Sequence, residues 1–511
     1  MTTPERTPTV GDILTKHSRG MADRVAVVCG DVRLTWRQLD ERVDRLAAAL
    51  AADGVGRGDQ VLWLGQNCHR LLEGLLAAGR LGAVFCPANW RQSPAELAFV
   101  IDDVEPTVVI WQETEVGETV AAARGQSSSA KDAHWIQHDG PGDASEYEDY
   151  LAASDPTSFT PPVVDADDPF VMIYTAAFEG RPNGALLSHR AWLHQNMVTA
   201  YIMGTTAEDV CLCCSPMFHV GMLRHALSAF QLGGRNVIAR RVEAEDLCRL
   251  IDAERCTVTF LQAPTMAQMA AGNADGRYDL SSLRSAPGTP EWNAMVTVDE
   301  RPLKNGFGQT ELAGIITFSS TRAPGIGAAG RPIPVAEVEV VDPDGTVLGP
   351  GEVGELVVRG PMVMNGYHRR PELNAHRRRG GWHHTNDLGR REEDGTLSFV
   401  GPVTRIVKSA SENIYPSEVE ACIRAHPDVR EVGIIGVPDP VWTQSVLAVV
   451  VPEEGATITG DDIVEHCRLH IASYKKPRHV EFLDALPRTP DGAVNYDALD
   501  EKFGGGGYPA K

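Results

Sequence analysis

With 511 residues, of which 43% are apolar and 23% charged, the chain has the composition of a globular protein of at least two domains. Its formal charge of −22 excludes the basic footprint that binds nucleic acid or an anionic membrane. No apolar run reaches the roughly 18 residues of a membrane span, and the opening MTTPERTPTV lacks the order of a signal peptide. We therefore expect a cytoplasmic protein with no nucleic-acid partner and no membrane span.

The N-terminal part alternates between short apolar strands and longer helices. Strands are predicted at residues 24–28, 61–64 and 83–87, and Thr35 is a plausible N-cap for an alanine-rich helix. Such alternation is typical of parallel sheets covered by helices, so we expect an α/β fold. Residues 125–162, rich in Ser, Asp, Gly and Pro, are predicted to form a surface excursion between two subdomains.

A phosphate-binding arrangement is predicted after the apolar strand at 170–174. The loop TAAFEGRPNG follows at 175–184, and Ser188 then caps a helix. Loop amides and the N-terminus of a helix can both face an anion. Glu179 opposes the binding of a triphosphate, however, unless Arg181 turns inward to compensate.

The cysteine-rich run VCLCCSPMF at 210–218 allows two interpretations. A Cys-x-x-Cys pair with His219 close behind would supply too few ligands for a structural zinc site. The run is instead predicted to be a strand buried in the core.

The stretch from Trp382 to Glu420 separates two predicted folding units. The acidic turn at 392–395, EEDG, joins two short apolar runs in the manner of a β-hairpin. After the join at 401–404, GPVT, Pro416 opens a helix at a position where its missing N–H costs nothing.

Charged residues flank this join on both sides. Asp387 comes shortly before it, and Lys408 and Glu412 come shortly after it. This arrangement predicts a site assembled between two domains. Strands at 432–437 and 446–451 and a helix near 463–471 then predict a small C-terminal α/β domain.

The order of these residues resembles the hinge region of the adenylate-forming enzymes, which include acyl-CoA synthetases, luciferases and nonribosomal adenylation domains. Their pattern G-W-x-x-T-G-D-L-G, followed by E-N-I-Y-P-x-E-V-E, is matched here by GWHHTNDLG at 381–389 and ENIYPSEVE at 412–420. The resemblance is closest to fatty-acid-type acyl-CoA ligases. It implies an N-terminal AMP-binding domain at about 10–400, with two α/β subdomains and a β-rich one, and a mobile C-terminal domain at about 403–500.

The resemblance also implies roles for individual residues. Catalytic roles fall to Thr310, which would donate to the α-phosphate, to Glu311, which would also hold Mg²⁺, and to Lys408, which some relatives use after the small domain has rotated. Read alone, Lys408 could equally be a solvated strand lysine. Nucleotide-binding positions are Thr175, Gly180, Gly184, Phe307, Gly308, Gln309 and Asp387, with Phe307 stacking on adenine.

Further roles concern the acyl group, the hinge and CoA. His219, in the element PMFH, would border the acyl pocket, although a lone histidine could also be a hydrogen-bonded core residue. Pro402 and Thr404 occupy the hinge, and Ser411 and Glu412 lie on the CoA side. The implied cofactors are ATP or AMP, Mg²⁺ and CoA, and the implied partner is a carboxylic acid.

Three positions depart from the family pattern in the same electrostatic direction. Asn183 and Ala493 stand where relatives carry lysines, and Glu179 stands where they carry a hydroxyl. The residues expected to hold the nucleoside part remain. We therefore expect weak ATP binding, with AMP or an acyl-adenylate favoured, and a gain in adenylation when the lost charges are restored.

Three functions follow from this combination. The leading hypothesis is a divergent acyl-CoA ligase that converts a fatty-acid-like carboxylic acid, through an acyl-adenylate, to a CoA thioester. The second is an enzyme that starts from a ready-made adenylate or thioester. The third is a catalytically silent protein that binds acyl groups or nucleotides. The sequence leaves the acid and the existence of a homodimer open.

Overall fold

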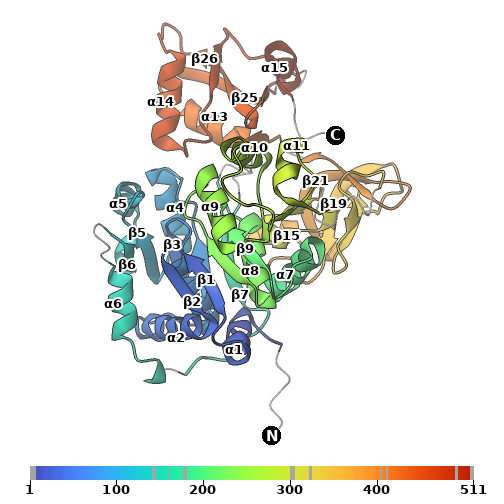
Figure 1. The fold of residues 1–511 in the computed structure, drawn as a ribbon. Coiled ribbons are helices and arrows are strands. Elements are labelled where there is room, and N and C mark those ends of the chain that lie inside the picture. Colours follow the sequence, from blue (N-terminus) through green and yellow to red (C-terminus); the bar gives the residue numbers. More distant parts are fainter. Residues whose placement is uncertain are drawn as a thin grey trace.

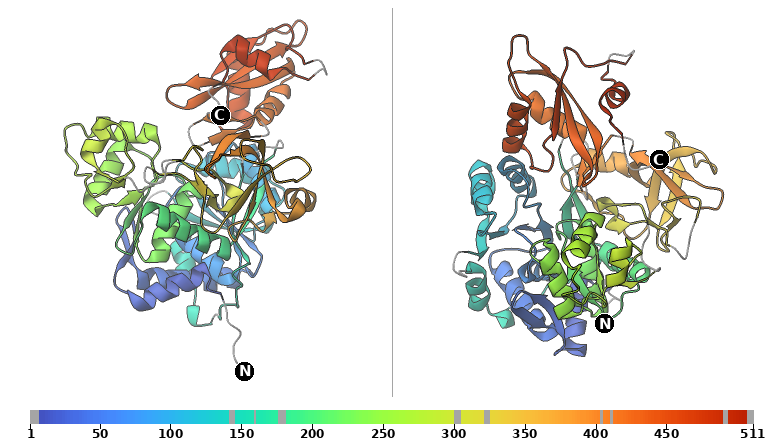
Figure 2. Two further views of the ribbon diagram at one scale, coloured as in Figure 1. Left: turned by 90° about the vertical axis from the view of Figure 1, so that its right-hand side faces the viewer. Right: turned by 45° about the horizontal axis from the view of Figure 1, so that its top comes forward.

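A large N-terminal part and a small C-terminal domain make up the computed structural model (Figure 1). In both further views the small domain stands at the top of the N-terminal part (Figure 2). Among the described residues, its two hydrophobic clusters draw only on 407–503, and the other clusters extend no further than Phe399. The predicted two-part α/β fold is confirmed. The structure describes residues 7–140, 145–158, 160–175, 181–299, 305–320, 325–402, 405–409, 412–489 and 493–506.

The largest sheet has seven strands in the order β20-β8-β7-β4-β3-β5-β6. Strands β3 to β7 pair in parallel, whereas β8 and β20 are antiparallel. Its strands are β3 (Gln60–Leu64), β4 (Val84–Pro87), β5 (Val108–Gln112), β6 (His134–Asp139), β7 (Pro169–Tyr174), β8 (Gly184–Ser188) and β20 (Gly366–Tyr367). The associated helices are α3 (His69–Leu81), α4 (Pro94–Val104), α5 (Gly117–Gln126) and α6 (Glu146–Ala153).

The prediction of a surface excursion over residues 125–162 is wrong. The segment contains the edge strand β6, which pairs in parallel with β5, and the helix α6. Trp135 and Ile136 are buried, and Tyr147 donates a 2.7 Å hydrogen bond to the buried Glu73. The polar composition of the flanking turns hid a short strand whose apolar residues are few but buried.

The second sheet has the order β11-β9-β10-β1-β2. Cys211, Cys213 and Cys214 are buried in or directly after β9, which confirms the predicted core strand. Thr35 accepts a 3.2 Å hydrogen bond from the backbone N–H of Gln38, as its predicted capping role requires. The strands are β1 (Val25–Cys29), β2 (Val32–Thr35), β9 (Val210–Cys213), β10 (Arg235–Ile238) and β11 (Val258–Thr259).

Helices α1 (Val10–Gly20), α2 (Trp36–Ala52), α7 (His189–Met203) and α8 (Val220–Leu232) contribute buried residues to the main core. Ser188 caps α7 as predicted, because its side chain accepts from the N–H of Ala191. Helices α9 (Ala244–Glu254), α10 (Ala263–Gly272) and α11 (Pro290–Met295) follow. Within the described ranges, no helix combines the length and the apolar composition needed to cross a membrane.

The β-rich subdomain is an antiparallel sheet of β18 (Glu337–Val341), β19 (Val353–Arg359), β21 (His383–Arg391) and β22 (Leu397–Pro402). The predicted D-G hairpin joins β21 to β22, and Gly395 has the left-handed φ of 79° that such a turn favours. Short strands β14 (Gly308–Gln309) and β15 (Gly314–Ile315) and helix α12 (Pro371–Arg377) lie outside this sheet.

The chain changes sheets between β22 and β23. The C-terminal sheet contains β23 (Val407–Ser409), β24 (Glu412–Ile414), β25 (Val429–Asp439), β26 (Thr443–Pro452) and β27 (His479–Phe482). Its helices are α13 (Pro416–Arg424), α14 (Gly460–His470) and α15 (Tyr496–Phe503). Pro416 is the first residue of α13, as its sequence position predicted.

Candidate active site

The 305–311 motif forms a tight turn at the edge of the β-rich subdomain. Strands β14 and β15 approach so closely that a Cβ atom on Gly308 would lie 2.2 Å from the carbonyl oxygen of Gly314. Gly308 is therefore required by backbone packing. Phe307 is 9% exposed and stacks on Phe399, with ring centroids 5.3 Å apart. Phe399 thus covers one face of the ring that was expected to stack on adenine.

Glu311 follows in a short 3₁₀ turn, Thr310–Leu312, and is only 8% exposed. The hydroxyl of Tyr367 donates a 2.7 Å hydrogen bond to its Oε1 atom. Glu311 also lies close enough to Asp387 to raise the pKa of that carboxyl. Two carboxylates at such proximity, one buried and one half-buried, repel each other, and a divalent cation would relieve the repulsion. The predicted Mg²⁺ role of Glu311 fits this arrangement.

Asp387 lies between the 305–311 motif and the small domain. Burial, with a smaller contribution from Glu311, raises its pKa to about 7, although Gln309 donates a hydrogen bond to it. The same Gln309 amide donates to the carbonyl oxygen of Thr385 at 2.7 Å. Lys408, on β23 of the small domain, is half-buried. Burial lowers the pKa of Lys408, while attraction to Asp387 raises it.

The raised pKa of Asp387 predicts that the free energy of unfolding depends on pH. The unfolded carboxyl titrates near 3.8 and the folded one near 7, so the folded state is destabilised progressively between these values and by about 4 kcal/mol above pH 7. Asp387→Asn removes the charge at nearly constant volume. We expect this variant to unfold with a higher free energy than the wild type, and the gain to be larger at pH 8 than at pH 5.

Urea unfolding at the two pH values measures this difference. Glu393→Gln is the matched control, because Glu393 is an exposed carboxylate in the turn of the same hairpin. The prediction is contradicted if Asp387→Asn raises the free energy of unfolding equally at pH 5 and pH 8, or if Glu393→Gln raises it in the same way.

The loop at 175–184, which is predicted to bind phosphate, is described at Thr175 and at residues 181–184. Thr175 donates its N–H to the carbonyl oxygen of Asn183 at 2.9 Å. A Cβ atom on Gly184 would lie 2.6 Å from the sulfur of Met172, so this glycine is also needed for packing. Arg181 lies over the ring of Phe99, with its Cζ atom 5.5 Å from the centroid.

A cation that the sequence analysis missed lies beside this loop. Arg370 donates from Nε to Asn183 Oδ1 at 3.2 Å and from Nη2 to Asp103 Oδ1 at 2.6 Å. The hydroxyl of Tyr174 donates to the other oxygen of Asp103 at 2.7 Å. A guanidinium, paired with Asp103, therefore lies beside Asn183, the position where relatives are expected to carry a lysine. Nothing in the sequence indicates that the turn after β20 reaches this loop.

The structure brings His219 and Glu412 together across the two domains. His219 Nε2 and Glu412 Oε1 are 3.0 Å apart, and Arg91 forms an ion pair with the same Glu412 oxygen. Burial alone would raise the pKa of Glu412, but His219 and Arg91 lower it to about 2. Arg91 is the second member of the site that sequence reasoning missed.

A second charged contact between the domains is more deeply buried. Lys475 donates to Glu96 at 2.6 Å and to Glu418 at 2.5 Å, and its side chain is 8% exposed. These carboxylates raise its pKa against the effect of burial. Glu96 belongs to α4 of the N-terminal part, so this interdomain triad (Glu96, Glu418 and Lys475) favours the observed domain orientation. The hydroxyl of Ser93 adds a 3.0 Å hydrogen bond to the carbonyl oxygen of His470.

The other predicted residues fall into three groups. Pro402 pairs with Asp387 at the end of β22. Ala493 is exposed in a turn of the small domain, where its carbonyl oxygen accepts from the N–H of Thr489 at 2.9 Å. Gly180, Thr404 and Ser411 lie outside the described residues.

Comparisons with known proteins agree with this architecture. The sequence matches the AMP-binding enzyme family over residues 14–368 and the AMP-binding enzyme C-terminal domain over residues 418–493. It is 36% identical over 500 residues to a feruloyl-CoA synthase of Amycolatopsis sp., covering 96% of this chain and 98% of that protein. It is 33% identical over 494 residues to an indoleacetate–CoA ligase of Aromatoleum aromaticum, covering 94% and 96%.

Among solved structures, the fold is similar to the amide bond synthetase McbA from Marinactinospora thermotolerans. The TM-score is 0.83 at 26% identity, and the match covers 97% of this chain and 100% of that chain. The chain therefore belongs to the AMP-binding enzyme family, which places it in the adenylate-forming superfamily. Within that superfamily it belongs with the acyl-CoA ligases.

Proposed function

We propose that the protein is an acyl-CoA ligase that activates an aryl or arylalkyl carboxylic acid and transfers it to CoA. The observation that carries this proposal is the approach of Lys408, from the small domain, to Asp387, which lies near Glu311 in the N-terminal part. A cation between two domains suits chemistry in which negative charge moves between a carboxylate and a phosphate.

In the first step, a carboxylate oxygen attacks the α-phosphorus of ATP and pyrophosphate leaves. Thr310 would donate a hydrogen bond to the α-phosphate, and Asp387 would bind the ribose hydroxyls. Mg²⁺, held by Glu311, would neutralise the phosphate oxygens. Arg370 beside Asn183 supports binding of the pyrophosphate portion, because its charge lies at the end of the phosphate loop.

In the second step, the thiol of CoA attacks the acyl carbon, a C–S bond forms, and AMP leaves with the former carboxylate oxygen. Lys408 would stabilise the charge on the departing phosphate. The observed orientation, in which Lys408 approaches Asp387, suits this second step. Trp442 supports CoA as the acceptor. It is 39% exposed, and Arg478 lies over its ring at 5.2 Å, a pairing that suits a base and a phosphate.

The aromatic surroundings of α8 support an aryl acid over the fatty-acid-like substrate expected from sequence. His225 and Phe260 stack with centroids 5.3 Å apart, and Phe218 packs on His219 with centroids 4.4 Å apart. Flat rings of this kind favour a planar substrate. The names of the feruloyl-CoA and indoleacetate relatives support the same class. The cytoplasmic location stays a prediction.

The test is a direct comparison of acids. Pyrophosphate exchange and CoA-thioester formation are measured with ferulate, indole-3-acetate and decanoate, and mass spectrometry identifies the thioester. We expect kcat/KM for the better aryl acid to exceed that for decanoate by at least about tenfold, which corresponds to about 1.4 kcal/mol of discrimination.

Asp387→Asn is the control, because it removes the proposed ribose ligand and should abolish exchange with every acid. A preference for decanoate would overturn the aryl proposal. Thioester formation from a supplied acyl-adenylate, without exchange, would favour the second hypothesis. AMP binding without either reaction would favour the silent homologue.

A further inference from the structure

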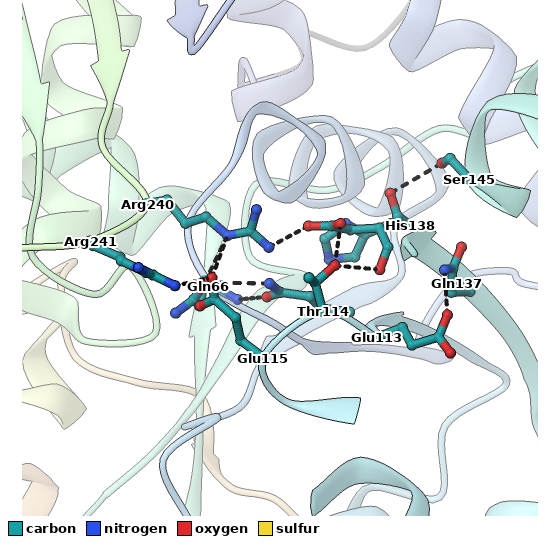
Figure 3. Close-up of polar contacts among 11 residues, drawn as sticks. Gln66, Glu113, Thr114, Glu115, Gln137, His138, Ser145, Arg240 and Arg241 are labelled. Carbon is teal, nitrogen blue, oxygen red and sulfur yellow. Dashed lines mark hydrogen bonds and ion pairs between the residues drawn. The ribbon is translucent and has the colours of Figure 1, made fainter. Parts of the chain in front are cut away.

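A separate cavity lies between the two large sheets, at the carboxyl ends of β1, β3, β5, β6 and β10. Its volume is about 320 Å³, at the lower end of the range typical of small-molecule sites. Figure 3 shows Arg240, which lines the cavity, with its side chain beside Gln66 and with His138 further along. We call it the inter-sheet cavity. Its lining includes Cys68, His69, Gln66, Gln112, His138 and Arg240.

The topology of the seven-stranded sheet places a crevice at this point. Strand β3 leads through α3 to β4 on one side, whereas its neighbour β5 leads through α5 to β6 on the other side. Connections that leave adjacent parallel strands in opposite directions open a ligand crevice at their carboxyl ends. Gln66 and Gln112 mark it, because the Gln66 N–H donates to Gln112 Oε1 at 2.8 Å.

Two histidines at the inter-sheet cavity are buried without full hydrogen bonding. His138 is 2% exposed and stacks on Trp63 with centroids 4.4 Å apart, and neither ring nitrogen has a partner among the described residues. His69 is 6% exposed, and its Nδ1 atom has no partner there either. Burial lowers the pKa of both to about 3, so each ring is neutral with one donor and one acceptor. Such groups are stabilised when a ligand or water supplies the partner.

The charged groups that line the inter-sheet cavity are three arginines, Arg70, Arg240 and Arg249, and two carboxylates, Asp139 and Asp246. Arg240 donates from Nε to Gln66 at 2.8 Å and from Nη2 to Asp139, and its Nη1 group has no partner among the described residues. Arg70 and Arg249 also line the cavity, and each is held by one carboxylate, Glu148 or Asp246. A guanidinium has five donors, so one carboxylate leaves capacity for a second anion.

The N-terminus of α3 adds further donors. Helix α3 has 13 residues, and its N-cap, Cys68, makes no side-chain capping hydrogen bond. The first amides of a helix and its dipole favour an anion. The arginines, the unpartnered histidines and this helix end therefore converge on the same volume.

We propose that the inter-sheet cavity binds a small organic anion carrying one carboxylate or one phosphate monoester, at a site distinct from the nucleotide site. The arginines and the α3 amides would bind the charged group. His138 and His69 would each exchange a hydrogen bond with the remainder of the ligand. The proposal rests on the inter-sheet cavity alone and holds whether or not the protein is a ligase.

Two thiols provide a local readout. Cys29 and Cys68 line the inter-sheet cavity and are partly exposed, whereas the partly exposed Cys422 lies on α13 of the small domain. Burial raises the pKa of Cys68 to about 12, so alkylation by N-ethylmaleimide is followed at pH 9 by peptide mass spectrometry. The probes are benzoate and inorganic phosphate, each added to the full-length protein.

We expect one probe, at ten times its Kd, to slow the alkylation of Cys29 and Cys68 by about tenfold, while Cys422 reacts at an unchanged rate. Protection by benzoate assigns a carboxylate ligand, and protection by phosphate assigns a phosphate monoester. Arg240→Gln should abolish the protection. Arg249→Gln, at a more exposed position, should weaken it, and Asp387→Asn should retain it.

Three results would overturn the proposal. The first is no protection by either probe. The second is equal protection of Cys422. The third is protection that persists in both arginine variants when each melts as the wild type does.

Discussion

Replacing Ala493 with lysine is expected to raise pyrophosphate exchange by about 10²-fold. Relatives of this superfamily use a lysine at this position for the adenylation step, and a preorganised cation facing developing charge is worth about 10²–10³ in rate. Ala493 is exposed in a turn of the small domain, so the longer side chain is accommodated without repacking. Thioester formation from a supplied acyl-adenylate should change little, because a different orientation of the domain serves that step.

Ala493→Met is the matched control, since it adds a side chain of similar length without the charge. Equal exchange by the Lys and Met variants would remove the electrostatic explanation. If neither variant nor the wild type exchanges pyrophosphate with any acid, the chain has left ligase chemistry.

The structure revises one related expectation. Restoring a lysine at Asn183 seemed favourable from sequence, but Asn183 accepts a hydrogen bond from Arg370. A lysine there would face a like charge at short range, which is unfavourable. Asn183→Lys is therefore expected to give no gain. Glu179, the third position considered, lies outside the described residues.

Replacing Lys475 with methionine is expected to shift the small domain away from its observed orientation. The substitution leaves Glu96 and Glu418 facing each other without a cation, and removing one partner of a buried ion pair typically costs about 3–5 kcal/mol. Rotation of the domain separates the two carboxylates, because they belong to different domains. Pyrophosphate exchange should therefore rise relative to thioester formation.

Small-angle X-ray scattering measures the orientation, and the two partial reactions measure its effect. Lys476→Met is the control, since Lys476 is the neighbouring residue and lies outside the interdomain triad. If Lys475→Met gives the same scattering curve as the wild type and the same ratio of pyrophosphate exchange to thioester formation, the interdomain triad does not set the orientation.

Local signals in the sequence predicted much of the fold. Thr35 and Ser188 cap helices because short polar side chains can accept from the first turn, and the D-G pair at 394–395 turns a hairpin. These effects act over a few residues and can be identified from the sequence. The strand β6 was missed because Trp135 and Ile136 are its only apolar residues, within a polar segment.

The site was predictable only where its residues belong to contiguous motifs. Thr310, Glu311, Asp387 and Lys408 were predicted in this way, and their roles stay predictions. Arg91, Arg370 and Lys475 were missed, because each acquires its role from a contact more than 50 positions away in the chain. An isolated basic residue looks the same in sequence whether it is solvated or paired.

The small domain's contacts with segment 89–96 have a consequence for protein engineering. Asn89, Arg91, Ser93 and Glu96 all come from this one stretch, and each contacts a residue of the C-terminal domain. A chimera that takes its C-terminal domain from a relative would therefore need this segment from the same donor. The segment and the domain would be exchanged together, although just over 300 residues of sequence lie between them.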